Sequence, residues 1–400
     1  MLVKFILLII FLFISSICRN KNYEMKPKII RYNKFKRKNL SIKNIEENLM
    51  PYILYVKSIK EGNFPKIFHN NSYSKPKATF IASVFNKEKY LESFISSIQM
   101  QILKEIEIII IDDFSIDKSG KIIKNFIKRD KRIKMIKNKK NMGSLYSRAI
   151  GGNIAKAEYI IFFDSDDIIL KEGILKAYHH SVKFNLDIVQ FLSILQKNET
   201  IYTTNNYYKY KNVINQPVLN YIFYCNSTGL ENNVALWDKL VKKKVVLKSL
   251  EYIGRKYIQN RLKIENDVIL LYTIFKMAKS YQFIDSFGYY YFFRTNQDSI
   301  SNTWDNPEKS NEIIYSVLTN VKFLYEKSKN TFFDKYFCVF KAKQSFRRYK
   351  KILKYADKQF YFMKNLFNTL LDSQFISNKD KLDLMKIYLT IFNLDGSIRK

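Results

Sequence analysis

The sequence predicts an α/β fold in which a mostly parallel sheet is flanked by helices. Between residues 78 and 193, short apolar runs that indicate strands alternate with segments whose apolar residues recur at helical spacing. Strands that alternate with helices in this way form parallel sheets built from βαβ units. Two runs, Glu107–Ile111 and Glu158–Phe163, are almost wholly apolar, which is typical of strands covered on both faces.

Five strands with four intervening helices are expected in this part of the chain. The expected strands are Ala78–Phe85, Glu107–Ile111, Ile133–Ile136, Glu158–Phe163 and Asp187–Leu192. The expected helices are Lys87–Gln101 and three more, which contain Ile122 with Phe126, Leu145 with Ala149, and Ile174 with Tyr178. Each helix lies between two strands, as a parallel sheet requires.

The alternation weakens beyond residue 195. Asn232–Leu250 and Asp267–Ser280 are expected to be helical, and the aromatic-rich segment Tyr281–Arg294 is expected to be a strand. Residues 305–400 have mostly helical periodicity and are very basic. Before the first strand, residues 19–76 form a basic stem that contains a short helix near Leu49–Ile59.

Composition supports a folded protein but does not identify its partner. The chain has 400 residues, of which 47% are hydrophobic and 16% aromatic, enough for a sizeable core and too many for a disordered chain. The net charge of +33 accompanies scarce Gly and Pro and abundant Phe and Tyr, which is typical of a genome-wide bias. Without a zinc finger or RNA-binding motif, we expect no nucleic-acid partner. Three cysteines exclude a disulfide framework.

The first 18 residues are typical of a targeting segment. Lys4 precedes the apolar run Phe5–Ile14, which suits a signal-peptide core and is short for a transmembrane helix. Ser16 and Cys18 are small enough for a cleavage site, although an uncleaved signal anchor stays open. We therefore expect a secretory-pathway protein of the endoplasmic reticulum or Golgi, lumenal or membrane-anchored. Four Asn-x-Ser/Thr patterns fit glycosylation but arise easily by chance in so Asn-rich a chain: Asn39, Asn70, Asn198 and Asn226.

Carboxylates follow two of the expected strands directly. Asp112 and Asp113 come after the second strand, and Asp164 and Asp166 come after the fourth. Ligands of open α/β sheets bind at the carboxyl ends of the strands, where these acids would gather. They would repel one another unless a cation joined them, and a divalent metal that carries a diphosphate meets that need. The alternative is that each Asp is an ordinary helix cap or turn residue.

Four motifs together resemble family 2 glycosyltransferases, which have the Rossmann-like GT-A fold. They are Ser83 to Leu91 around Asn86, Asp112 to Asp117, Asn141-Met142-Gly143 with Arg148-Ala149, and Asp164-Ser165-Asp166-Asp167. The resemblance covers the part of the chain from Ala78 to about Ser301. It implies an inverting glycosyltransferase of the hexosyltransferase type that takes a sugar from a nucleotide-diphosphate donor, with a UDP-sugar favoured, to a hydroxyl of a glycan, lipid or protein.

The resemblance also assigns roles at the donor side. Asp113 would accept the ring N–H of uracil, with Asp112 as its neighbour. Asp166 would bind Mn²⁺ or Mg²⁺, and Asp164 would approach the ribose or a metal-bound water. The predicted nucleotide-sugar-binding residues are Phe85, Asn86, Asp112, Asp113, Arg148, Asp164 and Ser165, and the predicted metal ligands are Asp166 and Asp164. An ordinary surface arginine is the alternative for Arg148.

On the acceptor side, the resemblance places the general base at Asp267. Asn266 stands where the family usually has Glu, and Glu265 is the alternate base. The other interpretation of Asp267 is a helix cap. Trp237 would stack on an acceptor sugar, unless it is a core aromatic. Arg294 resembles a closing segment that contacts phosphate.

The expected organisation follows from these assignments. It comprises a signal peptide or anchor (1–18), the stem (19–76), a GT-A domain (77–301, divided at 193/194 into nucleotide-binding and acceptor halves) and a helical basic C-terminal region (302–400). The alternative function is a catalytically inactive homologue that binds sugar or nucleotide or acts as a scaffold. A nucleotidyltransferase is disfavoured, because no Gly-rich phosphate loop follows the first strand.

Overall fold

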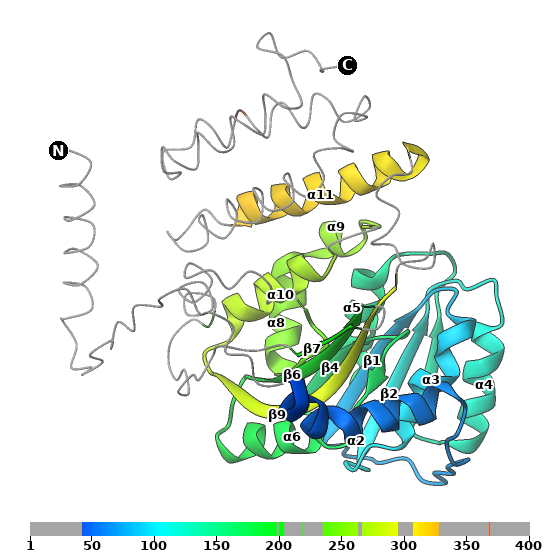
Figure 1. Cartoon of the computed structure of the whole chain (residues 1–400). Helices are drawn as coiled ribbons and strands as arrows, with labels where there is room; N and C mark the ends of the chain where they lie inside the picture. Colours follow the sequence, from blue (N-terminus) through cyan, green and yellow to red (C-terminus); the bar gives the residue numbers. More distant parts are fainter. Residues whose placement is uncertain are drawn as a thin grey trace, which may run out of the picture. The chain divides into compact units, whose positions relative to one another are not determined.

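The computed structural model describes residues 42–197, 200–203, 235–262, 266–294 and 307–327, together with residues 218 and 368 (Figure 1). The chain divides into two compact units, Met1–Ile53 and Leu54–Lys400. In the first unit, the described residues belong to helix α2 (Ile42–Lys60), which continues into the second. The second unit contains the sheet and every residue discussed below.

Within the described residues, nine strands form one mixed sheet. Their bounds are β1 Ala78–Val84, β2 Ile106–Asp112, β3 Ile133–Lys137, β4 Tyr159–Asp164, β5 Ile168–Ile169, β6 Ile188–Lys197, β7 Thr200–Thr203, β8 Lys239–Lys242 and β9 Tyr281–Phe293. The strand order is β3-β2-β1-β4-β8-β6-β9-β5, and β7 pairs with β6. β1 to β4 are parallel to one another, and β8 joins them antiparallel to β4.

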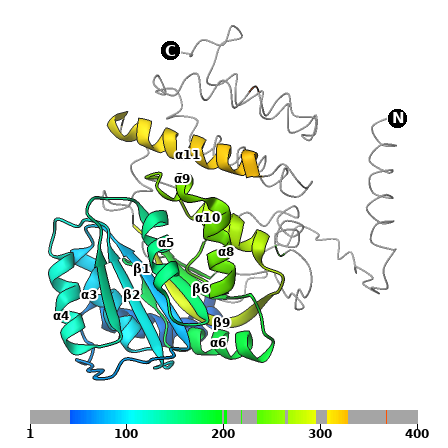
Figure 2. The same ribbon diagram turned by 180° about the vertical axis from the view of Figure 1, so that it is seen from behind.

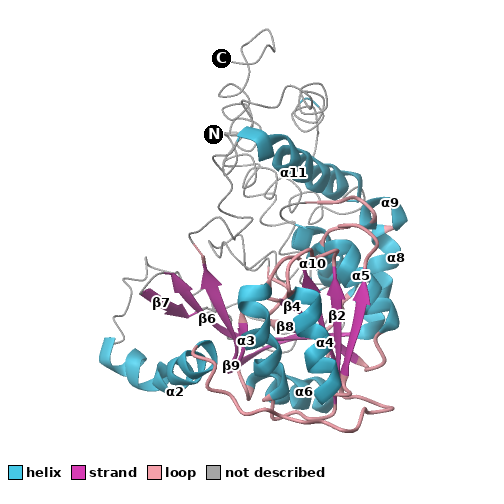
Figure 3. Cartoon of the chain, turned by 90° about the vertical axis from the view of Figure 1, so that its right-hand side faces the viewer, coloured by secondary structure: helices cyan, strands magenta, loops and turns pink. Residues whose placement is uncertain are grey.

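Both faces of β1, β2 and β4 are buried, as the apolar runs predicted. Alternate residues of these three strands enter opposite cores, so that Ile81 of β1 lies in one core and Phe80 in the other. The helices are α3 Glu88–Gln99, α4 Ser119–Arg129, α5 Ser144–Ile154, α6 Gly173–Lys183, α8 Lys243–Ile253, α9 Arg255–Ile258, α10 Asn266–Met277 and α11 Pro307–Lys327. Figure 3 shows α3 and α4 on one side of the sheet and α5 and α8 on the other, and Figure 2 shows the latter side from the front.

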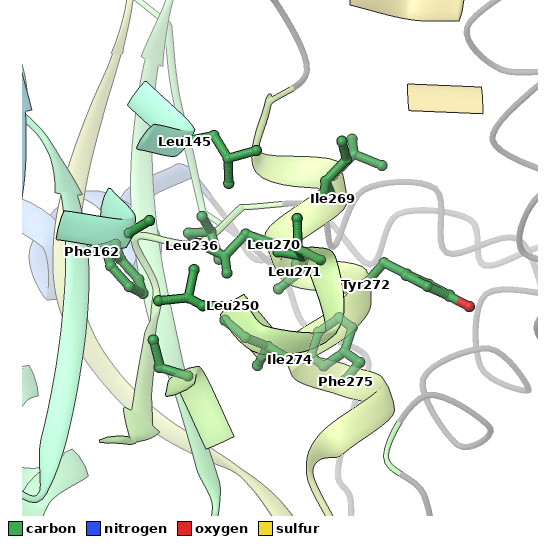
Figure 4. Packing of buried hydrophobic residues seen from close by; sticks show 14 of the residues in the cluster. Leu145, Phe162, Leu236, Leu250, Ile269, Leu270, Leu271, Tyr272, Ile274 and Phe275 are labelled. Carbon is green, nitrogen blue, oxygen red and sulfur yellow. The ribbon is translucent and has the colours of Figure 1, made fainter. Parts of the chain in front are cut away.

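Helix α10 is apolar on nearly every side because it is enclosed by other elements. Ile269 to Phe275 are buried, and they pack with Leu145 of α5 and Phe162 of β4 in one core (Figure 4). Leu250 of α8 belongs to the same core. This packing fixes the start of α10, and therefore Asp267, against the carboxyl end of β4.

The structure confirms the predicted α/β class with a mostly parallel sheet flanked by helices. The segment 235–242, which was expected to be helical, is not, because Leu240 and Val241 of β8 are buried between β4 and β6, and only Lys243 onward forms a helix. β5, β7 and α9 were not predicted, and β6 extends to Lys197, beyond the predicted end at Leu192. Among the described helices, none is both long and apolar enough to span a bilayer. The predicted targeting segment, Asn198, Asn226, Glu265 and the region beyond residue 327, apart from residue 368, lie outside the described residues.

Candidate active site

The carboxyl ends of β1, β2 and β4 meet where the strand order reverses. The sheet grows from β1 towards β2 and β3 on one side, whereas β4 lies on the other side of β1. Ligands of open α/β sheets bind in the crevice at such a switch point. The register pairs Val84 with Asp112 and Ser83 with Asp164, so the acidic ends of β2 and β4 are nearly level on the two sides of β1.

Asp113 holds the loop that follows β3. Its Oδ1 accepts hydrogen bonds from the Asn138 side chain at 2.7 Å and from the Met142 N–H at 2.8 Å, and its Oδ2 accepts one from the Gly143 N–H at 2.7 Å. Gly143 has a φ of +88°, which favours glycine. The buried Asp113 carboxylate thus has three donors of its own chain around it.

The loops after β1 and β2 are tied to each other. Ser115 Oγ accepts a hydrogen bond from the Asn86 N–H, and Asn86 Oδ1 accepts one from the Ile116 N–H, both at 3.0 Å. The buried Asp112 closes the second loop, because its Oδ1 accepts the Ser115 N–H at 2.8 Å. Phe85 is 39% exposed beside this paired structure. The structure therefore brings four of the predicted nucleotide-sugar-binding residues, Phe85, Asn86, Asp112 and Asp113, to one end of β1 and β2.

Arg148 on α5 joins the two carboxylates that were predicted to act on opposite sides of the reaction. Its Nη2 donates to Asp164 Oδ1 at 2.9 Å, and its Nη1 donates to Asp267 Oδ1. The arginine side chain is only 5% exposed, so it is a buried bridge and not a surface residue. Asp267 lies in the first turn of α10, where its carboxylate faces this guanidinium.

Asp166 receives two cations from different parts of the chain. Lys87 Nζ lies 2.7 Å and Arg294 Nη1 3.2 Å from its Oδ2. Arg294 Nη2 also donates to the Asp166 carbonyl oxygen, and its guanidinium lies over the Tyr90 ring with its carbon 4.1 Å from the centroid. Lys87 follows β1 and Arg294 follows β9, so three strand ends converge on this carboxylate.

Asp167 is buried and accepts hydrogen bonds from two residues of β9. Its Oδ2 accepts a hydrogen bond from the Tyr289 hydroxyl at 2.8 Å, and its Oδ1 accepts the Phe292 N–H at 3.0 Å. The Tyr289 hydroxyl also accepts the Asp164 N–H at 3.4 Å. These contacts fix the backbone of the acidic segment against β9.

The side chains of Ser165 and Trp237 contact neighbouring residues of the same chain. The Ser165 hydroxyl donates to the Ser83 carbonyl oxygen at 2.9 Å. The Trp237 indole stacks on Tyr289 with ring centroids 4.6 Å apart and on Tyr291 at 5.6 Å. Trp237 is half-buried, in agreement with its interpretation as a core aromatic, and its contact with an acceptor stays a prediction.

Burial and crowding raise the pKa values of two acids here. Burial raises the pKa of Asp164 above its ordinary value, and the charges of Asp267 and Asp166 add to this, although Arg148 opposes it. Burial also raises the pKa of Asp167, with Asp166 as the next cause. Several carboxylates close together in a poorly solvated place repel one another. An added positive charge would therefore stabilise their ionised forms.

The predicted metal ligands fit a divalent ion that enters with a diphosphate. Carboxylate oxygens are the donors that Mn²⁺ and Mg²⁺ prefer, and those of Asp164 and Asp166 already attract three side-chain cations. Within the described residues, no group of three or more His, Cys, Asp or Glu side chains is arranged to hold a metal. Substrate oxygens would therefore have to complete the coordination.

Sequence reasoning missed the partners more than the acids. Lys87 and Asp167 lie within the motifs that carry the resemblance, but the sequence indicated no role for them or for Tyr289. Asp167 carried a signal, because it directly follows Asp166. The pairing of Lys87 with Asp166, and that of Arg148 with Asp267, join positions far apart in the chain and left no local pattern.

A family model supports the resemblance. Residues 79–230 match the model described as glycosyl transferase family 2. A cholesterol galactosyltransferase of Borreliella burgdorferi is 30% identical over 236 residues, which cover 57% of this chain and 63% of that protein. An uncharacterized glycosyltransferase of Haemophilus influenzae is 40% identical over 111 residues, 28% of this chain and 44% of that protein. The chain thus covers less than two thirds of either relative.

Solved structures share the fold. The S. aureus TarS fragment 1–349 in complex with UDP-GlcNAc superposes with a TM-score of 0.54 at 16% identity, covering 80% of this chain and 89% of that one. A second S. aureus TarS structure gives 0.51 at 17% identity and covers 80% of this chain and 54% of that one. At this identity the similarity establishes the GT-A architecture.

Proposed function

Because residues 79–230 match the glycosyl transferase family 2 model, we propose that the chain is an inverting glycosyltransferase. It would move a sugar from a nucleotide-diphosphate donor, with a UDP-sugar favoured, to a hydroxyl of a glycan, lipid or protein. One observation carries the proposal: Lys87, Arg148 and Arg294 meet Asp164, Asp166 and Asp267 at the carboxyl ends of β1 and β4. The UDP-GlcNAc bound by TarS supports the choice of donor.

The nucleotide would lie over the loops that follow β1 and β2. Phe85 offers an exposed ring to the base, and the uracil N–H would approach Asp113 or its neighbour Asp112. Because the Asp113 carboxylate already accepts three hydrogen bonds, base recognition there would share it with the loop of Met142 and Gly143. Asn86 and Ser165 would support the donor through the backbone that they hold.

The diphosphate would lie between the ends of β1 and β4. Asp166 and Asp164 would hold Mn²⁺ or Mg²⁺, which when bound supplies positive charge to the leaving diphosphate. Arg148, which is held by Asp164 and Asp267, adds positive charge beside the reacting centre.

The transfer itself needs a base on the face of the sugar opposite the diphosphate. Asp267 would take the proton of the acceptor hydroxyl while the acceptor oxygen bonds to the anomeric carbon and the bond to the diphosphate breaks. The diphosphate leaves with the electron pair, and the configuration inverts. Arg148 holds Asp267 through Oδ1 and so orients its carboxylate.

Turnover with a donor panel tests the proposal. The full chain is incubated with Mn²⁺, a mixture of glycan, lipid and peptide acceptors and individual nucleotide sugars, and the released nucleoside diphosphate is measured. We expect release from at least one UDP-sugar, with loss of activity when the metal is chelated. A chain that binds UDP but releases none from any donor would support the inactive, sugar-binding or scaffold alternative.

Entry into the secretory pathway is a separate proposal, based on the apolar run Phe5–Ile14 behind Lys4. A glycosidase-sensitive mass at Asn198 or Asn226 would support it. Full-length protein found in the cytosol with residues 1–18 retained would contradict it.

A further inference from the structure

Lys87 spans the switch point of the sheet. It is the third residue after β1, whereas its partner Asp166 is the second after β4, and its Nζ lies 2.7 Å from Asp166 Oδ2. Its backbone is fixed, since its N–H donates to Ser119 Oγ at 2.9 Å and the preceding Asn86 has a φ of +52°. The ammonium group therefore sits at the crevice that this fold uses for ligands.

The two cations on Asp166 are held differently. Arg294 contacts the Asp166 carbonyl oxygen as well as its carboxylate, lies 3.6 Å from Asp167 Oδ1, and has its guanidinium over the ring of Tyr90. Lys87 Nζ reaches the same Asp166 oxygen but makes a more distant ring contact, 6.0 Å from the Tyr90 centroid. A lysine ammonium on its flexible stem is also more easily redirected than an arginine fork.

The charges at Asp166 favour an exchange of partners. One carboxylate oxygen is shared by two side-chain cations, and both side chains are partly exposed, Lys87 by 21% and Arg294 by 15%. A metal ion that bound Asp166 would repel the nearest movable cation. A diphosphate that arrived with the metal would offer that cation new oxygens, and charge-assisted bonds to phosphate are strong.

We propose that Lys87 is a diphosphate-binding residue, which leaves Asp166 for a phosphate oxygen when the metal and the diphosphate bind. This inference rests on the proposed donor class but concerns a residue to which no role has been given. In this account the Lys87–Asp166 pair is the resting arrangement of the site. Arg294 remains on the Asp166 backbone throughout.

Three variants of the full chain test the exchange. Lys87→Gln removes the charge, and Lys87→Arg restores it with a different reach. Lys134→Gln is the matched control, because Lys134 Nζ also lies 2.6 Å from a carboxylate, that of Glu107, at the opposite end of the strands. Calorimetry measures the Kd of inorganic diphosphate and of UDP at saturating Mn²⁺, and electron paramagnetic resonance measures the binding of Mn²⁺ alone.

We expect Lys87→Gln to weaken the binding of both phosphate ligands about ten- to a hundredfold, the effect of a lost hydrogen bond to a charged group. Its binding of Mn²⁺ alone should be at least as tight as in the unchanged chain, because a competing cation is gone. Lys87→Arg should recover part of the phosphate affinity, and Lys134→Gln should change neither. A purely structural role for Lys87 would not weaken the binding of the phosphate ligands while leaving the binding of Mn²⁺ as tight as before.

The outcomes separate this inference from the proposed function. If Lys87→Gln binds both phosphate ligands as tightly as the unchanged chain, the inference is wrong and the proposed function stands. If the unchanged chain binds inorganic diphosphate through Lys87 but not UDP, the inference stands and the uridine donor is wrong. If the unchanged chain binds neither, both are overturned.

Discussion

Two buried arginines, at opposite ends of the parallel strands, differ in the number of carboxylates that they bind. At the amino ends Arg132 pairs with Asp130, whereas at the carboxyl ends Arg148 pairs with both Asp164 and Asp267. Arg132 Nε and Nη2 donate to the two oxygens of Asp130 at 2.9 and 2.7 Å, and both side chains are fully buried. Asp164 and Asp267 each receive one nitrogen of Arg148 and keep 33% and 27% of their surface exposed.

The two arrangements shift the pKa values of their aspartates in opposite directions. Burial alone would raise the pKa of Asp130, but the hydrogen bonds and charge of Arg132 outweigh it and lower that pKa. At Asp164 burial prevails, Asp267 and Asp166 add to it, and the pKa is raised. Arg132 serves one carboxylate, that of Asp130, which also accepts a hydrogen bond from the Gln99 side chain at 3.1 Å. Arg148 instead serves two carboxylates, which leaves negative charge that an added cation can neutralise. We therefore assign stability to the first region and ligand exchange to the second.

The largest effect is expected from Asp267→Asn. The amide keeps the size of the side chain but cannot accept the proton, so turnover should fall by about two to four orders of magnitude. UDP binding should change little, because the proposed base faces the acceptor and not the nucleotide. Steady-state kinetics with the active donor measure the first, and calorimetry the second.

Two alternatives for Asp267 give different results. A helix cap tolerates Asn as well as Asp, so turnover would be nearly unchanged. Lower stability with normal turnover of the folded protein would mean that Asp267 only holds Arg148. In either case Glu265→Gln is the next variant, since Glu265 is the alternate base.

Arg132→Met should lower the stability of the protein and leave the donor site unchanged. It leaves the Asp130 carboxylate buried without its cation, and breaking a buried pair in this way costs about 3–5 kcal/mol. The free energy of unfolding from urea titration should fall by that amount, while the Kd of UDP for the folded protein stays the same. A loss of UDP affinity in the folded variant would show that the two regions are not independent.

Arginine-to-lysine changes compare the two bridges directly. Lysine keeps the charge but cannot serve two carboxylates with a rigid fork. In Arg148→Lys, the loss of one charged hydrogen bond should lower kcat about ten- to a hundredfold. Arg132→Lys should leave kcat unchanged and lower the free energy of unfolding instead. Equal kcat values for the two variants would remove the functional distinction between the regions.

The smallest effect concerns pH. The folded-state pKa of Asp130 is lowered, so its pair contributes stability that is present above the unfolded pKa of about 4 and is lost as the pH falls below it. Urea titrations between pH 6 and 3 should give a steeper loss for the unchanged chain than for Asp130→Asn. Identical slopes would mean that the pair does not titrate on unfolding.

Much of the fold followed from local patterns, and much of the site did not. β1, β2 and β4 were predictable because each is a largely apolar run, and the acids at the ends of β2 and β4 were found with them. β8 was missed because four residues, two of them lysines, precede a helix without a break. Lys239 is buried there beside Asp238, with Nζ 2.6 Å from Oδ1, a pairing that only the folded sheet creates.

The partners of the acids depend on packing across the chain. Asp267 reaches Arg148 because α10 packs against α5, α8 and α11, and no residue near Asp267 in sequence indicates this. The same holds for Lys87, whose contact with Asp166 requires β1 and β4 to be neighbours. Residue types at strand ends could be inferred from sequence, but the way in which they share charge could not.

Calorimetric titration of UDP at saturating Mn²⁺ tests the central distinction most directly. The proteins are the unchanged chain, Asp166→Asn at the carboxyl ends of the strands and Asp130→Asn at the amino ends, with the folded fraction of each measured by circular dichroism. We expect Asp166→Asn to bind UDP at least about tenfold more weakly, because a charged contact is lost. Asp130→Asn should bind it with unchanged Kd. Equal UDP affinity in Asp166→Asn and the unchanged chain would contradict the assignment of the donor to this end of the sheet.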